Sequence, residues 1–297
     1  MSPSDPMPNR ATRFDALMAL EIPGIEHRYT HRDVILYALG CGAGPDEPDL
    51  VNERAGLRVL PSMATVLAYP GDWYRNLATG LNADQIVHAS ERVELFTDLP
   101  TRGHLRAKPR ITAIQDKGEG RGAIIVSERE IRDAVTGQPL ARVTQRAFCR
   151  GDGGLGGPMV PLAPPPALPD RAADQVLSLR TSERAAAIYR LMGDDNPLHI
   201  DPDTARTAGF ARPILHGLSG YGHICRALTA RLTPDLRVTE FECRFTAPVL
   251  PGEDIALEIW DLPGGMRFRG HCRGRIAFDH GILRFAPRAG AAAGPSS

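Results

Sequence analysis

The stretch GDGGLGGPMVPLAPPPALPD, residues 151–170, contains glycine and proline too densely to form a helix or a central strand. The same order of elements occurs on both sides of it: helical patterns come first, and alternating, strand-like segments follow. Length also favours about two domains, since 297 residues, 42% of them hydrophobic, can bury two medium cores. We therefore predict two similar domains, residues 13–150 and 173–288, joined by a linker over 151–172. The Pro- and Ser-rich residues 1–12 and the small, polar residues 289–297 are predicted to be mobile tails.

The first half predicts two helices followed by antiparallel strands. An apolar stripe in THRDVILYALGCGAG predicts a helix that the glycines end. LRVLPSMATVLAYP, residues 57–70, predicts a buried helix opened by Pro61, because a proline in the first turn lacks only an N–H that would have no partner there. Three segments predict strands, the last broken by a hairpin signal at Thr136-Gly137: ASERVELFTDLP, HLRAKPRITAIQD and AIIVSEREIRDAVTGQPLARVTQRAFC.

The second half repeats this order. ERAAAIYRLMG and LSGYGHICRALTARL predict helices, the latter with apolar residues at helical spacing from Leu218 to Leu232. FECRFTA and EDIALEI alternate apolar with polar residues and predict half-buried strands. GMRFRGHCRGRIAFDHGILRFAP predicts a final hairpin that turns at His280-Gly281.

The two halves align with each other, which indicates an internal duplication. Tyr37-Ala38-Leu39 matches Tyr189-Arg190-Leu191, and Leu60-Pro61-Ser62 stands where Leu215-His216-Gly217 stands. In this alignment Gly42, Gly44 and Glu47 occupy the places of Asp194, Asn196 and His199. A fold constraint alone would leave similar residues in both halves, so the asymmetry indicates that the chemistry is confined to the second half.

The segment MGDDNPLHIDP brings Asp194, Asn196 and His199 close together on a turn. Histidine has an unperturbed pKa of about 6.5, which suits proton transfer near neutral pH, so an Asp/His pair here can activate a water molecule. The alternative is that this is only good turn chemistry, with Asp201-Pro202 capping the next helix and His199 an ordinary loop residue.

His216-Gly217 directly precedes the second predicted helix of this half. A glycine N–H at a helix start points an unsatisfied donor, and the positive end of the helix dipole, at a developing oxyanion. The alternative is a tight loop that enters a buried helix. Together, a water-activating pair and an oxyanion donor are the parts needed to add water across a double bond conjugated to a carbonyl.

Charge and cysteine content restrict the partners. Lys+Arg and Asp+Glu both number 35, so nucleic acid is not an expected partner. The five cysteines are scattered and form no cluster of metal-binding spacing, which indicates a reduced, cytoplasmic setting and no metal. No signal peptide or membrane-spanning segment is expected from the hydropathy of the sequence.

MGDDNPLHIDP followed by ARPILHGLSGYG resembles the hydratase motif of the MaoC-like, (R)-specific (type 2) enoyl-CoA hydratases. The resemblance covers roughly residues 13–287 and includes VHASERVELFTDLP, DKGEG and RFTAPVLPGE. It implies an α+β, double hotdog fold, in which each half is a long helix wrapped by an antiparallel sheet. The second half would be catalytic, and the first degenerate and widened for an acyl chain.

The resemblance also assigns roles to individual residues. Asp194 and His199 match the catalytic pair, Asn196 a residue that helps to position the water, and Gly217 the main-chain oxyanion donor. It implies a substrate-binding set of His88, Lys117, His216 and Phe245. The sequence departs from the family at Ala89, where glycine is usual, and at Ser219-Gly220, where bulkier residues are common, and both departures concern acyl-chain preference.

The implied activity is reversible syn hydration of a trans-2-enoyl-CoA to a (3R)-3-hydroxyacyl-CoA in fatty acyl-CoA metabolism. It needs no cofactor, and coenzyme A is part of the substrate. The resemblance also suggests a homodimer. Two other classes stay open: an acyl-CoA thioesterase, because hotdog folds host that reaction too, and a non-catalytic acyl-CoA-binding protein. A hydratase for a branched, dicarboxylic or carrier-bound enoyl thioester is a further alternative.

Overall fold

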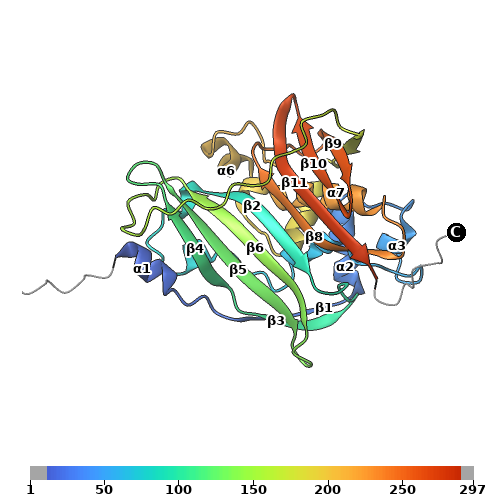
Figure 1. The fold of residues 1–297 in the computed structure, drawn as a ribbon, viewed down its shortest axis with the longest axis horizontal. Helices are drawn as coiled ribbons and strands as arrows, with labels where there is room; N and C mark the ends of the chain where they lie inside the picture. Colours follow the sequence, from blue (N-terminus) through green and yellow to red (C-terminus); the bar gives the residue numbers. More distant parts are fainter. Residues whose placement is uncertain (1–11, 289–297) are drawn as a thin grey trace, which may run out of the picture.

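The computed structural model describes residues 12–288 as one 11-stranded antiparallel sheet packed against helices (Figure 1). The predicted tails, apart from Thr12, lie outside the described residues. The strands follow the order β1-β3-β5-β6-β2-β8-β11-β10-β9-β7, and β4 pairs with β5. Strands of the first half are β1 (Ile25–Tyr29), β2 (Ile86–Leu95), β3 (Gly103–Ala107), β4 (Arg110–Asp116), β5 (Ala123–Asp133) and β6 (Pro139–Cys149). Those of the second half are β7 (Gln175–Arg180), β8 (Leu236–Phe245), β9 (Asp254–Leu262), β10 (Gly265–Cys272) and β11 (Arg275–Pro287).

The helices are short except for two. The first half has α1 (Arg13–Met18), α2 (His31–Gly40), α3 (Pro48–Val51), η1 (Pro61–Thr65), α4 (Trp73–Asn76) and η2 (Ala83–Gln85). The second half has α5 (Ala185–Tyr189), η3 (Arg190–Met192), η4 (Pro197–His199), α6 (Pro202–Thr207) and α7 (Gly217–Thr229). None of the helices in residues 12–288 has the length and hydropathy needed to cross a membrane.

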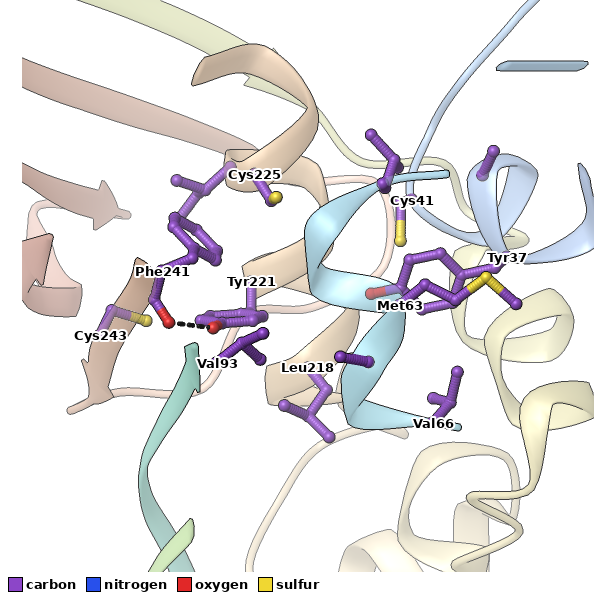
Figure 2. Close-up of a cluster of buried hydrophobic side chains, with 14 of the residues drawn as sticks. Tyr37, Cys41, Met63, Val66, Val93, Leu218, Tyr221, Cys225, Phe241 and Cys243 are labelled. Atoms are coloured by element: carbon purple, nitrogen blue, oxygen red, sulfur yellow. Dashed lines mark hydrogen bonds between the residues drawn. The ribbon is translucent and has the colours of Figure 1, made fainter. Parts of the chain in front are cut away.

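The two halves share a continuous sheet because β2 of the first half pairs with β8 of the second, from Ser90↔Arg244 to Glu94↔Glu240. This antiparallel sheet with its packed helices confirms the predicted α+β class. In the second half, α7 carries the predicted apolar face, with Tyr221, Cys225 and Leu228 fully buried. Figure 2 shows the Tyr221 hydroxyl donating to the carbonyl oxygen of Phe241 on β8, at 2.6 Å.

The predicted long helix of the first half is wrong. Only Pro61–Thr65 form a helix within residues 57–70, and it is a 3₁₀ helix. Ala68 then has a left-handed φ of 47°, which no helix can continue through, and Pro70 follows. The first half therefore covers its inner sheet face with short helices and loops, residues 57–76, where the second half uses α7.

The predicted turn at His280-Gly281 is also wrong. The β10–β11 hairpin turns at Arg273-Gly274, both with positive φ, whereas His280 (φ 54°) lies inside β11 at a break in the β8–β11 register. A hairpin turn and a β-bulge both call for residues that tolerate positive φ, so the His-Gly signal did not distinguish them. HLRAKPRITAIQD likewise forms two strands, because Pro109 cannot donate to the sheet.

Residues 151–174 form neither helix nor strand, and they cross from one half to the other over the sheet (Figure 1). Arg267 of β10 holds this segment by donating to the carbonyl oxygens of Pro166 at 2.8 Å and Ala167 at 3.1 Å. Trp260 adds a bond from Nε1 to the carbonyl oxygen of Arg171 at 2.9 Å. These bonds anchor residues 166–171 to the second half.

Candidate active site

The turn from Gly193 to Ile200 is shaped by its own polar residues. Gly193, at φ 104°, ends η3 in the left-handed conformation that glycine adopts at little cost. Asn196 caps η4, its Oδ1 accepting from the N–H of Leu198 at 3.0 Å, so that its side-chain NH₂ group is left to bind other groups. Asp194 precedes this cap and His199 is the last residue of η4.

His199 has a fixed tautomer. Its Nδ1–H donates to the carbonyl oxygen of Ile214 at 2.9 Å, and since a carbonyl oxygen only accepts, Nε2 carries the lone pair. Burial lowers the pKa of His199, and the charge of Asp194 opposes this shift. A neutral imidazole with a free Nε2 beside a carboxylate can accept a proton from water.

His216 is buried against this pair, with only 1% of its surface exposed. Its ring stacks on that of His199, with centroids 3.8 Å apart, and its Nε2–H donates to the main-chain oxygen of Asp194 at 3.2 Å. Burial, followed by the neighbouring His199, lowers the pKa of His216 to about 3. The structure thus places His216 as the link between the Asp194 turn and the start of α7.

Gly217 is the first residue of α7 and is exposed, and backbone N–H groups in a first helical turn have no acceptor within their helix. A Cβ at Gly217 would lie 3.3 Å from the ring of Phe245, so this ring packs against the helix start. Glycine therefore lets a flat ligand approach the N–H group closely.

His88 of β2 is the residue of the first half that lies beside Phe245 and the start of α7. The His88 ring lies 4.7 Å from that of Phe245, edge to face, and its Nε2 lies 2.9 Å from a carboxylate oxygen of Glu91. Lys117 lies apart from this group, with its ammonium 4.6 Å from the ring centre of Phe148. Of the predicted substrate-binding residues, His88, His216 and Phe245 therefore gather near Gly217, and Lys117 lies towards the β4–β5 turn.

Sequence reasoning missed three polar residues of the first half that lie near this group: Tyr69, Glu91 and Arg129. Burial, and then the charge of Asp194, raise the pKa of Tyr69. Glu91 is 1% exposed and Arg129 6%. The sequence contained a signal for Glu91 and Arg129, because each is a charged residue at an inward position of a strand with alternating burial.

Asp194, His199 and His216 also form a group that could offer three ligand atoms to a metal ion, all within 4.8 Å of one another. A metal lies near the plane of each imidazole that binds it, whereas these two rings stack at 28° to each other. The absence of a metal stays a prediction, and the stacking does not favour joint ligation by the two histidines.

The buried histidines His216 and His223 predict that the free energy of unfolding decreases in acid. His223 of α7 is fully buried, donates Nδ1–H to the oxygen of Ser219 at 2.8 Å, and has a pKa lowered by burial to about 4. Like His216, it binds a proton less readily when folded than in the unfolded chain, where the pKa is about 6.5, so stability decreases as pH falls below 6.5. Each histidine is expected to remove about 1 kcal/mol of unfolding free energy between pH 6.5 and 5.5.

Urea unfolding at the two pH values measures this loss. The variant His223→Gln should lose about 1 kcal/mol of this pH dependence, because the contribution of His223 is removed. Equal unfolding free energies at both pH values in the parent protein would contradict the prediction.

Comparison with known proteins agrees with this architecture. Residues 27–151 match the family model described as the MFE-2 hydratase 2 N-terminal domain, and residues 166–270 match the MaoC like domain. The 3-hydroxyacyl-thioester dehydratase Y of Mycobacterium tuberculosis is 37% identical over 86% of this chain and 93% of its own length. The chain belongs to the MaoC-like family. Another member, the enoyl-CoA hydratase ChsH3 of the same organism, is 38% identical over 83% of this chain and 88% of its own length.

Solved structures share the fold. A MaoC-like dehydratase from Phytophthora capsici superposes with a TM-score of 0.83 at 27% identity, over 93% of this chain and 99% of the other. A Mycobacterium tuberculosis protein described as having a double hotdog fold superposes with a TM-score of 0.56 at 17% identity, over 90% of this chain and 94% of the other. The predicted double hotdog fold is thereby confirmed, with η1 in place of a long helix in the first half.

Proposed function

We propose that this MaoC-like protein is an (R)-specific enoyl-CoA hydratase, a hydro-lyase that adds water reversibly to a trans-2-enoyl-CoA. The observation that carries the proposal is the link between the two parts of the site. The ring of His216 stacks on that of His199, with centroids 3.8 Å apart, and Gly217 directly follows His216 in the chain. One bound enoyl thioester can therefore contact both the imidazole of His199 and the start of α7. The names of the relatives, an enoyl-CoA hydratase and a 3-hydroxyacyl-thioester dehydratase, support the same reaction.

The proposed roles follow from hydrogen-bond geometry. Nε2 of His199 and the carboxylate of Asp194 hold the water, with the NH₂ group of Asn196 as a further contact. The water oxygen forms a bond to C3, and a proton from the Asp194/His199 pair is delivered to C2 on the same face. The fixed tautomer of His199 favours Nε2 as the group that takes the proton from the water.

Gly217 N–H would donate to the thioester oxygen, on which negative charge develops as water attacks C3. The dipole of α7, a helix of 13 residues, adds positive potential at this end. Phe245 and His88 would flank the thioester, because both rings lie beside the helix start. The reaction proposed uses only water and the thioester, with coenzyme A as part of the substrate.

The test is a panel of trans-2-enoyl-CoAs of graded length and branching, incubated with the purified protein. The loss of absorbance of the conjugated enoyl thioester reports hydration, and chiral analysis identifies the product. We expect the (3R)-3-hydroxyacyl-CoA. Release of free thiol from saturated acyl-CoA without hydration would instead identify a thioesterase, and tight binding without turnover a binding protein.

The homodimer and the cytoplasmic location are part of the proposal. The resemblance to the family supports the first, and the five scattered cysteines, all free and buried, support a reducing compartment.

A further inference from the structure

The inner face of the first-half sheet carries an uninterrupted row of polar residues. Inward positions of β5 alternate with outward ones, and Ser127 and Arg129 are buried at inward positions between Ile125 and Ile131. The β5–β6–β2 register places Ser127 opposite Gln145, and Gln145 opposite Glu91. Three neighbouring strands therefore present polar side chains side by side on a face that is otherwise apolar.

This polar row, Ser127, Gln145 and Glu91 with Arg129 beside it, divides the hydrophobic interior of the first half. One apolar cluster includes Val93 and Ile131, and a second, separate cluster includes Trp73 and Ile125. A buried polar group costs stability unless it finds a partner. Ligand pockets are lined mostly by apolar side chains, with a few polar groups that fix the orientation of the ligand.

Arg129 has donor capacity left over. Its Nη2 donates to the carbonyl oxygens of Ala64, at 3.2 Å, and of Thr65, both in η1. Its Nε is buried and has no hydrogen-bond partner within residues 12–288. This buried donor calls for an acceptor oxygen.

The polar row begins at the candidate active site. Glu91 bonds to His88, which packs on Phe245 next to Gly217. Arg129 lies under the ring of Tyr69, 5.9 Å from its centre, and the charge of Asp194 acts on Tyr69. From β2 the row crosses two strand spacings to β5, roughly 10 Å, which an extended acyl chain of medium length can span.

We infer, on the basis of the proposed hydratase function, that the acyl group of the preferred substrate carries an oxygen substituent that accepts hydrogen bonds from this polar row. The class is a medium-chain enoyl thioester with a neutral hydroxyl or carbonyl oxygen towards its far end. A plain alkyl chain would leave the buried Nε of Arg129 unpaired.

The charges of the polar row favour a neutral oxygen over a carboxylate as the substituent of the acyl chain. Glu91 and Arg129 lie on the same inner face, and their opposite charges already compensate each other. A substrate carboxylate would add a second buried negative charge beside Glu91, whereas a hydroxyl or carbonyl adds none.

The test compares three substrates of one length: trans-2-decenoyl-CoA and its ω-hydroxy and ω-carboxy forms. The ω-hydroxy substrate is expected to have a kcat/KM about tenfold above that of the plain chain, because it pairs with the Nε of Arg129, which the plain chain leaves unpaired. The ω-carboxy substrate is expected to fall below the ω-hydroxy one.

The double variant Arg129→Met/Glu91→Gln removes both charges together, so that neither is left buried without its partner. In this variant the ratio of the two kcat/KM values, ω-hydroxy over plain, is expected to fall from about ten to about one. Arg142→Met is the matched control, because Arg142 lies on the outer face of β6 and pairs with Glu130, and the ratio should stay at its parent value. A ratio measured on one protein sample is not changed by a uniform loss of folded protein.

The outcomes separate the two proposals. If the plain chain is hydrated as well as or better than the ω-hydroxy chain, the inference is wrong and the hydratase function stands. The same holds if the ω-carboxy chain is preferred, or if the double variant keeps the parent ratio. If no enoyl-CoA of any kind is hydrated, the proposed function is wrong, and the inference that rests on it is wrong as well.

Discussion

Asp194→Asn is expected to reduce kcat/KM for hydration of crotonyl-CoA by about a hundredfold to ten-thousandfold, the range that a positioned acid or base contributes. The substitution keeps the size of the side chain and removes its charge, so water would lose one of the two groups that hold it. His199→Asn should have a comparable effect. Asparagine can still donate to Ile214 in place of Nδ1, but it has no counterpart of Nε2.

The exposed neighbour Asp195 gives the matched control, since Asp195→Asn makes the same chemical change one residue away. It should leave the rate close to that of the parent, with folding checked by circular dichroism. The double variant of Asp194 and His199 should be little worse than either single variant, because residues that act as one unit are not additive. Full activity in both single variants would show that the water is activated elsewhere.

The sequence predicted the parts of the fold that local patterns determine. Helical spacing identified α7 and alternation identified β8 and β9, because the apolar residues of each element face one core. Local patterns failed at η1, where Ala68 turns the chain out of the helix, and at His280, where a bulge has the same residue preference as a turn. Those outcomes depend on how the chain packs on the sheet, which spacing alone does not contain.

In the candidate site, too, the features set by local sequence could be predicted and those set by tertiary packing could not. The turn chemistry of Asp194 and Asn196 is local and could be read directly. The stacking of His216 on His199, and the approach of His88 to Phe245, join residues that are 17 or more positions apart in the chain. The inward position of His88 depends on the bulge between His88 and Ser90, because His88 is out of step with the alternation that Glu91 and Val93 follow.

The contacts of the first half with α7 explain why it lacks the polar residues of the second half. Glu47, which aligns with His199, forms an ion pair with Arg226 of α7 at 2.5 Å. Gly42, which aligns with Asp194, lies so close to α7 that a Cβ there would be 2.7 Å from Nε2 of His223. The corresponding segment of the first half is therefore used to dock against the helix of the second half, and has no room for a catalytic carboxylate.

That docking makes α7 the centre of the molecule, and Tyr221→Ala should be among the most destabilising single changes. Tyr221 is fully buried, packs on Phe241 at 4.3 Å between ring centres, and donates to the carbonyl oxygen of the same residue (Figure 2). Truncation leaves a cavity the size of an aromatic ring, for which a loss of about 3–5 kcal/mol of unfolding free energy is expected. Urea unfolding with circular dichroism measures it.

Tyr221→Phe separates packing from hydrogen bonding, because it keeps the ring and removes only the hydroxyl. It should cost about 1–3 kcal/mol, the price of leaving a buried carbonyl without this donor. If both variants lose the same amount, the hydroxyl and not the ring is what stabilises α7. Since the first residue of this helix is Gly217, a folded Tyr221→Phe protein should keep its hydration rate, whereas a displaced α7 would move the oxyanion donor and lower kcat.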